Sequence, residues 1–302
     1  MTNWPDPDRG ETIVALAGDW HGNYAWAERA LRHLKDRGVG TIYHLGDFGI
    51  WPSQNRDWYL EKLNNLCHVL DMYIWVTPGN HENWDWLDAI HGVDNGVAPH
   101  QILPGRVGTQ RLLVLPRGYR WSHAGRTFLS LGGAPSVDYS MRTAGQDWFL
   151  GEIIPAEVAD TVASAGHAAV MLAHDVPNLD IPMLRSILSR NSGGWPAEAL
   201  AYAAVGRQRL DIAYAGVAPQ LYAHGHYHLQ GDAFLDGGTR VLSLSKDGSG
   251  GNLVLIDLAA DDFGVTWIPL GPQPEPPSIR GSVDRYRDRG WAKFDIGLDD
   301  EA

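Results

Sequence analysis

The first eighty residues alternate between apolar runs and amphipathic helical patterns, and this alternation restricts the fold more than any other feature. Continuous apolar runs at 12–18, 41–47 and 72–80 are typical of strands that are buried on both faces. Between them, 24–35 places alanines and leucines on one helical face, and 56–68 is a second helical segment. Consecutive strand–helix–strand units of this kind predict a parallel sheet with right-handed crossovers.

Downstream of residue 100 the pattern changes and predicts a second sheet of mixed strand direction. The expected strands are short runs broken by Gly and Pro within 101–133, followed by runs at 168–175, 219–228, 238–245, 251–258 and 264–270. Helical segments are expected at 155–165 and, as a two-helix insertion lying over the sheet, at about 179–210. We therefore predict one α/β domain spanning 1–271. Residues 272–302 are Pro-rich and charged, which is typical of an extended or disordered tail.

Composition and charge argue against several kinds of protein. The chain of 302 residues carries a formal net charge of −12, which disfavours sequence-independent nucleic-acid binding because that binding needs a basic surface. No apolar run approaches the roughly 18 residues of a membrane span, and the acidic N-terminus lacks the pattern of a secretory signal. Cys67 is the single cysteine, so an internal disulfide is impossible, and the expected compartment is the reducing cytoplasm.

Polar side chains with metal-binding chemistry follow five of the predicted strands, at the point where each strand ends. In chain order they are Asp19 and His21, Asp47, Asn80 and His81, His174, and His226 and His228. In open α/β sheets the carboxyl ends of the strands form the ligand-binding edge, so these segments are expected to meet there. Each residue taken alone has a structural explanation, as a helix cap, a turn former or a hydrogen-bonded histidine. Their repetition at five strand ends favours one shared site.

The set of donors indicates the kind of site. Carboxylate and amide oxygens together with imidazoles suit first-row divalent ions such as Mn, Fe or Zn, whereas an all-oxygen set would favour Mg or Ca. Seven side chains are too many for one tetrahedral site and fit two ions that share a bridging carboxylate. Two such ions clamp the attacking and leaving oxygens of a phosphoryl displacement. They would also make the site locally positive, so a small anionic substrate is compatible with the acidic net charge.

The motifs at these strand ends stand in the order D-x-H, G-D, G-N-H-E, H and G-H-x-H, and the chain from Asp19 to His228 resembles the calcineurin-like metallophosphoesterase superfamily. The resemblance implies a two-sheet β-sandwich flanked by helices, in four α/β/β/α layers. It implies that one ion is held by Asp19, His21, Asp47 and His228, and the other by Asn80, His174 and His226, with Asp47 as the bridge. It places His81 near the leaving group, as general acid or transition-state stabiliser.

Within this superfamily the chain resembles the small bacterial and phage phosphodiesterases. Ser/Thr protein phosphatases and dinucleoside tetraphosphatases carry a phosphate-binding Arg after the second Asp, and the corresponding stretch here, G-D-F-G-I-W-P at 46–52, has none. The resemblance implies phosphodiester hydrolysis by attack of a metal-bound hydroxide, with a 2′,3′- or 3′,5′-cyclic nucleotide as the expected substrate. The implied cofactors are two divalent ions, Mn foremost and Fe, Zn, Co or Ni as alternatives. A phosphomonoesterase, a nuclease and a non-catalytic metal-binding scaffold are the alternative functions.

Several residues near the motifs keep two explanations. His224 lies outside G-H-x-H and is expected to pack within the strand or to support the ligands, while Gly225 is expected to permit the turn that directs His226 and His228 toward the ions. Four tryptophans could stack on a nucleobase or belong to the core, namely Trp20, Trp51, Trp84 and Trp86. For Arg142 a surface position is favoured over a contact with phosphate. The oligomeric state is not defined by the sequence.

Overall fold

The computed structural model describes residues 5–52, 55–92, 98–103, 110–191 and 193–271, and the predicted tail at 272–302 lies outside this part. The strands are β1 (Ile13–Ala17), β2 (Thr41–His44), β3 (Tyr73–Val76), β4 (His100–Gln101), β5 (Leu112–Val114), β6 (Tyr119–His123), β7 (Arg126–Leu131), β8 (Val170–Ala173), β9 (Leu221–His224), β10 (Gly231–Phe234), β11 (Arg240–Ser243), β12 (Leu253–Asp257) and β13 (Gly264–Ile268). The helices are α1 (Tyr24–Lys35), α2 (Arg56–Leu70), α3 (Trp84–Gly92), α4 (Ala156–Ser164), α5 (Arg185–Arg190) and α6 (Ala197–Val217).

The strands form two mixed sheets. In the described residues, the first sheet has the order β13-β12-β1-β2-β3-β5-β4 and the second the order β10-β11-β9-β8-β7-β6. The predicted parallel unit is confirmed, because β2 pairs in parallel with both β1 and β3. In the second sheet β7, β8, β9 and β11 are likewise parallel neighbours. The carboxyl ends of the parallel strands in each sheet therefore share one edge, where loops from distant parts of the chain can meet.

The core between the two sheets is built from side chains that alternate along each strand. In β1, Leu16 points into this shared core, whereas Ala15 and Ala17 face the helices on the other side of the sheet. Phe128 on β7 and Leu172 on β8 reach the same core from the second sheet. Successive side chains of a strand point to opposite faces, so an uninterrupted apolar run makes both faces of the sheet apolar.

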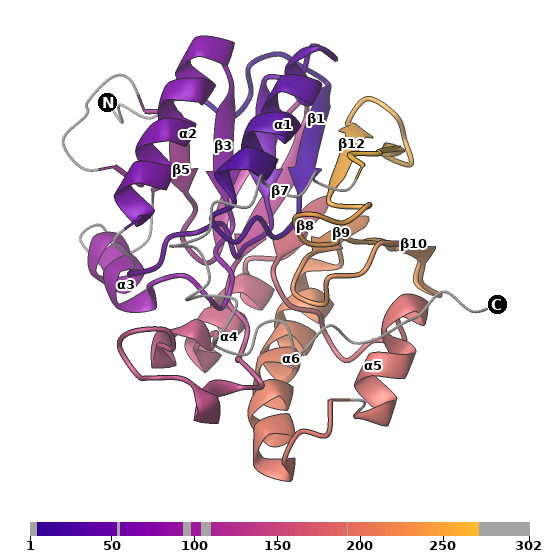
Figure 1. The fold of residues 1–302 in the computed structure, drawn as a ribbon. Coiled ribbons are helices and arrows are strands. Elements are labelled where there is room, and N and C mark those ends of the chain that lie inside the picture. The colour runs from indigo at the N-terminus through magenta and orange to yellow at the C-terminus, as the bar shows by residue number, and fades with distance from the viewer. Residues whose placement is uncertain (1–4, 53–54, 93–97, 104–109, 192, 272–302) are drawn as a thin grey trace.

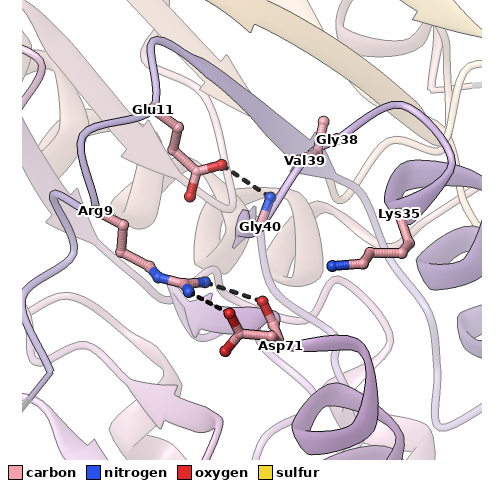
Figure 2. A pocket seen from close by; sticks show the side chains of 7 residues that line it. All are labelled: Arg9, Glu11, Lys35, Gly38, Val39, Gly40 and Asp71. Atoms are coloured by element: carbon pink, nitrogen blue, oxygen red, sulfur yellow. Dashed lines mark hydrogen bonds and ion pairs between the residues drawn. The ribbon is translucent and has the colours of Figure 1, made fainter.

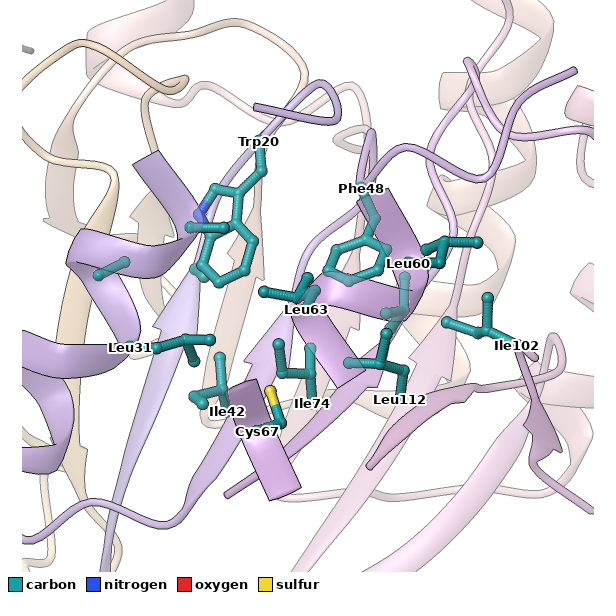
Figure 3. Close-up of a cluster of buried hydrophobic side chains, with 14 of the residues drawn as sticks. Trp20, Leu31, Ile42, Phe48, Leu60, Leu63, Cys67, Ile74, Ile102 and Leu112 are labelled. Carbon is teal, nitrogen blue, oxygen red and sulfur yellow. The ribbon is translucent and has the colours of Figure 1, made fainter. Parts of the chain in front are cut away.

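Helices cover the two outer faces, so that four layers result (Figure 1). α1 and α2 pack on the first sheet through a cluster that includes Leu31, Leu63 and Cys67 (Figure 3). α4 and α6 pack on the second sheet through residues such as Val162 and Leu210. The predicted α/β/β/α sandwich is therefore confirmed. None of the helices in the described ranges combines the length and the apolar character that crossing a bilayer would require.

Two local expectations differ from the structure. The short elements α3, β4 and β10 were not predicted, because a nine-residue helix and strands of two and four residues leave little periodic signal. The predicted insertion does contain two helices, but the second of them, α6, continues to Val217 and packs along α4. This helix therefore forms part of the layer that covers the second sheet.

At the opposite edge of the first sheet, where β1, β2 and β3 begin, polar residues line a pocket (Figure 2). Arg9 pairs with Asp71 at 2.8 Å. Glu11 accepts hydrogen bonds from the backbone N–H of Gly40 at 2.8 Å and from the hydroxyl of Thr41 at 2.6 Å. These contacts connect the segments that enter the three strands. An exposed pair such as Arg9–Asp71 contributes little to stability, and this end of the sheet lies away from the strand-end motifs.

Candidate metal centre

The eight candidate residues lie in loops that follow five parallel strands. Asp19 and His21 follow β1, Asp47 follows β2, Asn80 and His81 follow β3, His174 follows β8, and His226 and His228 follow β9. Asp19, Asp47, Asn80 and His174 are buried, and the other four are partly buried. Side chains that are far apart in the sequence thus reach the same edge of the fold, as the strand-end rule predicts.

One group of donors consists of Asp19, His21 and His228, whose ligand atoms lie within 4.8 Å of one another. Asp19 Oδ2 is 3.0 Å from His228 Nε2, and the ring centroids of His21 and His228 are 5.2 Å apart. Asp19 is completely buried, so its carboxylate is costly to keep without a cation or a donor beside it. This group contains the residues predicted for the first ion, apart from Asp47.

A second group consists of Asp19, Asp47 and His174, again with ligand atoms within 4.8 Å of one another. Asn80 lies next to it, because its Oδ1 is 3.0 Å from His174 Nε2. The ring of His226 is 5.0 Å from that of His174 between centroids, and the His226 backbone N–H donates to Asp19 Oδ2 at 3.2 Å. The residues predicted for the second ion are therefore neighbours, although His226 is outside the tightest group.

Asp47, a member of the second group, also lies close to a histidine of the first group. Its Oδ2 is 3.6 Å from His21 Nε2, and its Oδ1 is 3.4 Å from His174 Nε2. One carboxylate thus presents an oxygen to a histidine of each group, which is the arrangement that a bridging ligand requires. Although burial raises the pKa of Asp47, the imidazoles of His81 and His174 hold that pKa well below its usual range. Of the two carboxylates, Asp19 is the one that belongs to both groups of close ligand atoms, which the sequence did not indicate.

The buried charges of this region fit divalent cations. Burial lowers the pKa of His21, but the carboxylates of Asp247 and Asp47 outweigh burial and raise that pKa to about 10. The pKa of His174 is also raised to about 10 against the effect of burial, by Asp47 foremost. The surrounding carboxylates therefore favour positive charge at this position. Divalent ions would supply that charge, and oxygen and imidazole donors are the ligands such ions prefer.

Two of the histidines are oriented by hydrogen bonds at the ring nitrogen that faces away from the other donors. His174 Nδ1 donates to the carbonyl of Leu45 at 2.6 Å, so Nε2 is the ring nitrogen that could bind a metal ion. His21 Nδ1 lies 2.9 Å from Asp247 Oδ1, and Asp247 also accepts from Asn23 Nδ2 at 2.7 Å. Such partners fix the tautomer and the ring orientation of metal-binding histidines. Sequence reasoning missed Asp247, although this residue also follows a parallel strand, β11.

A second carboxylate that the sequence analysis missed, Glu82, holds the loops after β2 and β3 together. It is completely buried and accepts hydrogen bonds of 2.5–3.2 Å from the backbone N–H groups of Asp47, Phe48, Gly49 and Gly79. Burial and the nearby Asp47 raise the pKa of Glu82 to about 7. Glu82 directly follows His81 in G-N-H-E, so the motif contained the signal although no role was assigned to it.

Four of the candidate residues adopt left-handed backbone conformations that non-glycine residues rarely take. The angle φ is +46° at His21, +49° at Asp47, +68° at His226 and +56° at His228. Residues in such conformations concentrate at functional sites, where the surrounding structure imposes them. The left-handed turn that directs His226 and His228 is thus formed by the histidines themselves, and the expectation that Gly225 would form it was wrong.

Gly225 is required for a different reason, which is the space beside Asp19. A Cβ atom at position 225 would lie 2.2 Å from Asp19 Oδ1, far inside van der Waals contact. We expect Gly225→Ala to displace the Asp19 carboxylate and to weaken metal binding by about tenfold or more, measured by calorimetric titration of the metal-free protein. Gly250→Ala is the control, because nothing lies within 4 Å of that position. A Gly225→Ala protein that binds metal as tightly as the wild type would contradict this explanation.

Two of the residues with open explanations lie beside His81. The favoured surface position of Arg142 is wrong, because its side chain is only 8 % exposed: the segment after β7 returns to the loop after β3. The guanidinium donates to both carboxylate oxygens of Asp138, at 2.7 and 2.8 Å, and lies 2.7 Å from His81 Nδ1. Trp51 is partly exposed, with its ring 6.3 Å from the His81 ring. His81 therefore has a guanidinium and an indole as neighbours.

The other residues with open explanations are structural. Trp20 and Trp84 are buried in the cluster beneath α1 and α2, and Trp86 packs against that cluster. His224 is the buried last residue of β9, and its Nδ1 donates to the carbonyl of Gly225 at 2.9 Å. Within the described part of the chain, none of these four belongs to either group of close metal-binding donors.

Two mixed sheets between helices, with two groups of carboxylate and imidazole donors at one edge, form the architecture of a metal-dependent hydrolase. The family model described as calcineurin-like phosphoesterase matches residues 13–230, a range that includes all eight candidate residues. The chain belongs to this family. It is accordingly a metal-dependent phosphoesterase, from a family that uses a dinuclear centre of divalent ions.

Solved structures resemble this chain at low sequence identity. The protein TT1561 of Thermus thermophilus is 12 % identical with a TM-score of 0.51, over 85 % of this chain and 98 % of that one. A dimetal phosphatase from Danio rerio is 11 % identical with a TM-score of 0.48, over 82 % and 92 % of the two chains. The first likeness supports the sandwich fold and nothing beyond it, and the second is too distant to carry an argument. No curated protein sequence matches the chain.

Proposed function

We propose that this phosphoesterase hydrolyses phosphodiester bonds in small nucleotides, 2′,3′- or 3′,5′-cyclic nucleotides foremost. The observation that carries the two-ion centre is the position of Asp47, whose carboxylate oxygens face one histidine of each of the two groups that share Asp19. In this proposal one divalent ion is held by Asp19, His21, Asp47 and His228, and the other by Asn80, His174, His226 and the shared Asp47. Mn is the favoured ion, and Fe, Zn, Co and Ni are alternatives that accept the same donors.

The protein's own contribution is to hold these donors in place before a substrate arrives. Bound divalent ions would supply positive charge for the phosphate oxygens and would lower the pKa of a water molecule. The backbone N–H of His81 donates to Asp47 Oδ1 at 3.0 Å, and the carbonyl of Leu45 fixes the ring of His174. Groups that are fixed in this way need no reorganisation when charge develops in the transition state.

His81 is proposed to act on the leaving group. Its Nε2 is 3.7 Å from Asp47 Oδ2, and its side chain is 12 % exposed, so the ring lies at the boundary between the buried donors and solvent. Burial, with the nearby Arg142, lowers the pKa of His81 well below its usual range, so the neutral ring can donate a hydrogen bond to the departing alkoxide oxygen. The guanidinium of Arg142 lies 2.7 Å from Nδ1 and 3.2 Å from Nε2, so it contacts both ring nitrogens and holds the ring in place.

Trp51 supports a nucleotide as the substrate. Its partly exposed ring lies beside His81, and stacking of an aromatic side chain on a nucleobase contributes about 1–3 kcal/mol. We expect Trp51→Ala to raise KM for a cyclic nucleotide by about tenfold and to leave KM unchanged for a diester without an aromatic group. Phe234→Ala, which removes an exposed ring on β10, is the control. An equal effect of Trp51→Ala on both substrates would argue against stacking.

The class of ester is tested by comparing bis-p-nitrophenyl phosphate with p-nitrophenyl phosphate, after chelation and reloading with Mn. We expect the diester to be hydrolysed faster than the monoester, and only with metal present. Faster hydrolysis of the monoester would favour the phosphomonoesterase alternative. Cleavage of single-stranded DNA or RNA in a gel assay would favour the nuclease alternative, which the net charge of −12 disfavours.

The compartment and the extent of the catalytic domain also belong to this proposal. The cytoplasm is the proposed location, and the free thiol of Cys67, buried within α2, is compatible with that reducing compartment. The proposed catalytic domain spans 1–271, because strands from β1 to β13 contribute to two sheets that share one core. Size-exclusion chromatography with light scattering would define the oligomeric state.

A further inference from the structure

Besides Glu82, a second completely buried carboxylate outside the proposed ligands, Glu152, accepts four hydrogen bonds. Glu152 ends the short 3-10 helix Leu150–Glu152, and its side chain points into the protein behind Asn80. Its Oε1 accepts from the Ser136 backbone N–H at 2.6 Å, from Trp148 Nε1 at 3.0 Å and from the Tyr202 hydroxyl at 2.8 Å. Its Oε2 accepts from the Ser136 hydroxyl at 2.7 Å. A buried charge needs such partners, and two of the four bonds come from Ser136, whose hydroxyl also contacts Asn80.

The hydrogen bonds that connect Glu152, Ser136 and Asn80 can run in one direction only. An ionised carboxylate accepts and never donates, so the Ser136 hydroxyl must donate its single proton to Glu152. The Ser136 oxygen can then only accept, and the group that donates to it is Asn80 Nδ2, at 2.9 Å. The amide oxygen of Asn80 is consequently turned to the opposite side, where it lies 3.0 Å from His174 Nε2. A flipped amide would present hydrogens to the donor groups, and an NH₂ group does not ligate a cation.

We propose that Glu152 is a positioning residue that acts through Ser136 to keep the amide oxygen of Asn80 directed at the second metal ion. The inference rests on the proposed function, in which Asn80 is a ligand of that ion. It also gives a role to the predicted helical insertion, because Tyr202 belongs to α6 and donates to Glu152. α6 thereby supports the centre from behind, through the hydrogen bonds that connect Glu152, Ser136 and Asn80.

The test is a calorimetric titration of the metal-free full-length protein with Mn²⁺, at about pH 8, above the pKa of about 7 to which burial raises Glu152. Glu152→Gln keeps the shape of the side chain, but its amide can donate to Ser136. The Ser136 hydroxyl is then no longer forced to accept from Asn80. We expect this variant to bind one ion about tenfold or more weakly and the other ion as the wild type does, since outer partners of ligands change metal affinity by about 10–100-fold. Ser136→Ala is expected to have the same effect on the same ion.

The double variant distinguishes an effect of Glu152 that is transmitted through Ser136 from a general loss of structure around the site. If Glu152 acts through Ser136, the protein that carries both substitutions binds the affected ion no more weakly than the weaker single variant. Glu157→Gln is the matched control, because it makes the same change at an exposed glutamate in the first turn of α4, and it should bind both ions within about twofold of the wild type. Ser136→Ala carries the test alone if Glu152→Gln does not fold.

Three results would overturn the inference. These are unchanged Mn²⁺ affinity in both single variants, additive losses in the double variant, and equal weakening of both ions together with a lower Tm of the metal-free protein. The last result would mean that Glu152 supports the fold and not the direction of Asn80. A wild-type protein that binds fewer than two ions would instead contradict the proposed function itself, so the two failures are distinguishable.

Discussion

Asp47→Asn is expected to lower metal-dependent phosphodiester turnover by about 1000-fold or more. The substitution keeps the size of the side chain but removes its charge and replaces one of its two oxygens. Oδ1 lies 3.4 Å from His174 Nε2 and Oδ2 lies 3.6 Å from His21 Nε2, so either orientation of the new amide deprives one donor group of its shared oxygen. Losing the charge stabilisation of one ion costs several kcal/mol in the transition state, which corresponds to an effect of this size.

The measurement for Asp47→Asn is kcat/KM for bis-p-nitrophenyl phosphate with Mn in excess, together with the metal content of the reloaded protein. The wild type is expected to retain two ions per chain and the variant at most one. Asp232→Asn is the matched control, because it makes the same change at a carboxylate that pairs with Arg240 on the surface of the second sheet. An Asp47→Asn protein with two ions and more than about a tenth of the wild-type turnover would show that Asp47 is not the bridge.

His81→Ala is expected to lower kcat by about 100-fold or more while both ions stay bound. His81 is near Asp47 but lies outside both groups of close donors, so its removal should affect the leaving group and not the metals. Because the proposed role is to donate to the departing oxygen, the loss should grow as the leaving alkoxide becomes more basic. It should be smallest for p-nitrophenolate, which departs without assistance.

A series of aryl and alkyl diesters, with metal content measured in parallel, checks the role of His81. His68→Ala is the control, since His68 is an exposed histidine on α2. A loss that is equal for all leaving groups would assign His81 to phosphate binding and not to departure of the alkoxide. A His81→Ala protein that has lost an ion would mean that His81 is a ligand.

The proximity of the proposed ligands could be predicted because each follows a strand whose apolar pattern is strong. The runs that become β1, β2, β3, β8 and β9 are almost entirely buried, and parallel pairing brings their carboxyl ends to one edge. Asp19 and His228 are therefore in contact although they lie near opposite ends of the matched region, because each of them follows a strand that ends at this edge. The apolar pattern of the whole chain carries this information, since it defines which segments become parallel strands.

The supporting residues could not be predicted in the same way. Asp247 orients His21 across a separation of 226 residues, and Glu152 reaches Asn80 only through Ser136. Nothing in the local sequence distinguishes these polar residues from ordinary loop residues, because their roles depend on which loops become neighbours. Both Asp247 and Ser136 nevertheless follow parallel strands, β11 and β7, so a wider application of the strand-end rule would have included them.

The measurement that tests the central claim most directly is a crystal structure of the protein reloaded with Mn, with anomalous diffraction used to locate the ions. We predict two anomalous peaks at the carboxyl edge of the sheets, one beside Asp19, His21 and His228 and the other beside Asn80, His174 and His226. Asp47 is predicted to ligate both ions. A single peak, or two peaks with Asp47 bound to only one of them, would contradict the shared-carboxylate centre on which the proposed function rests.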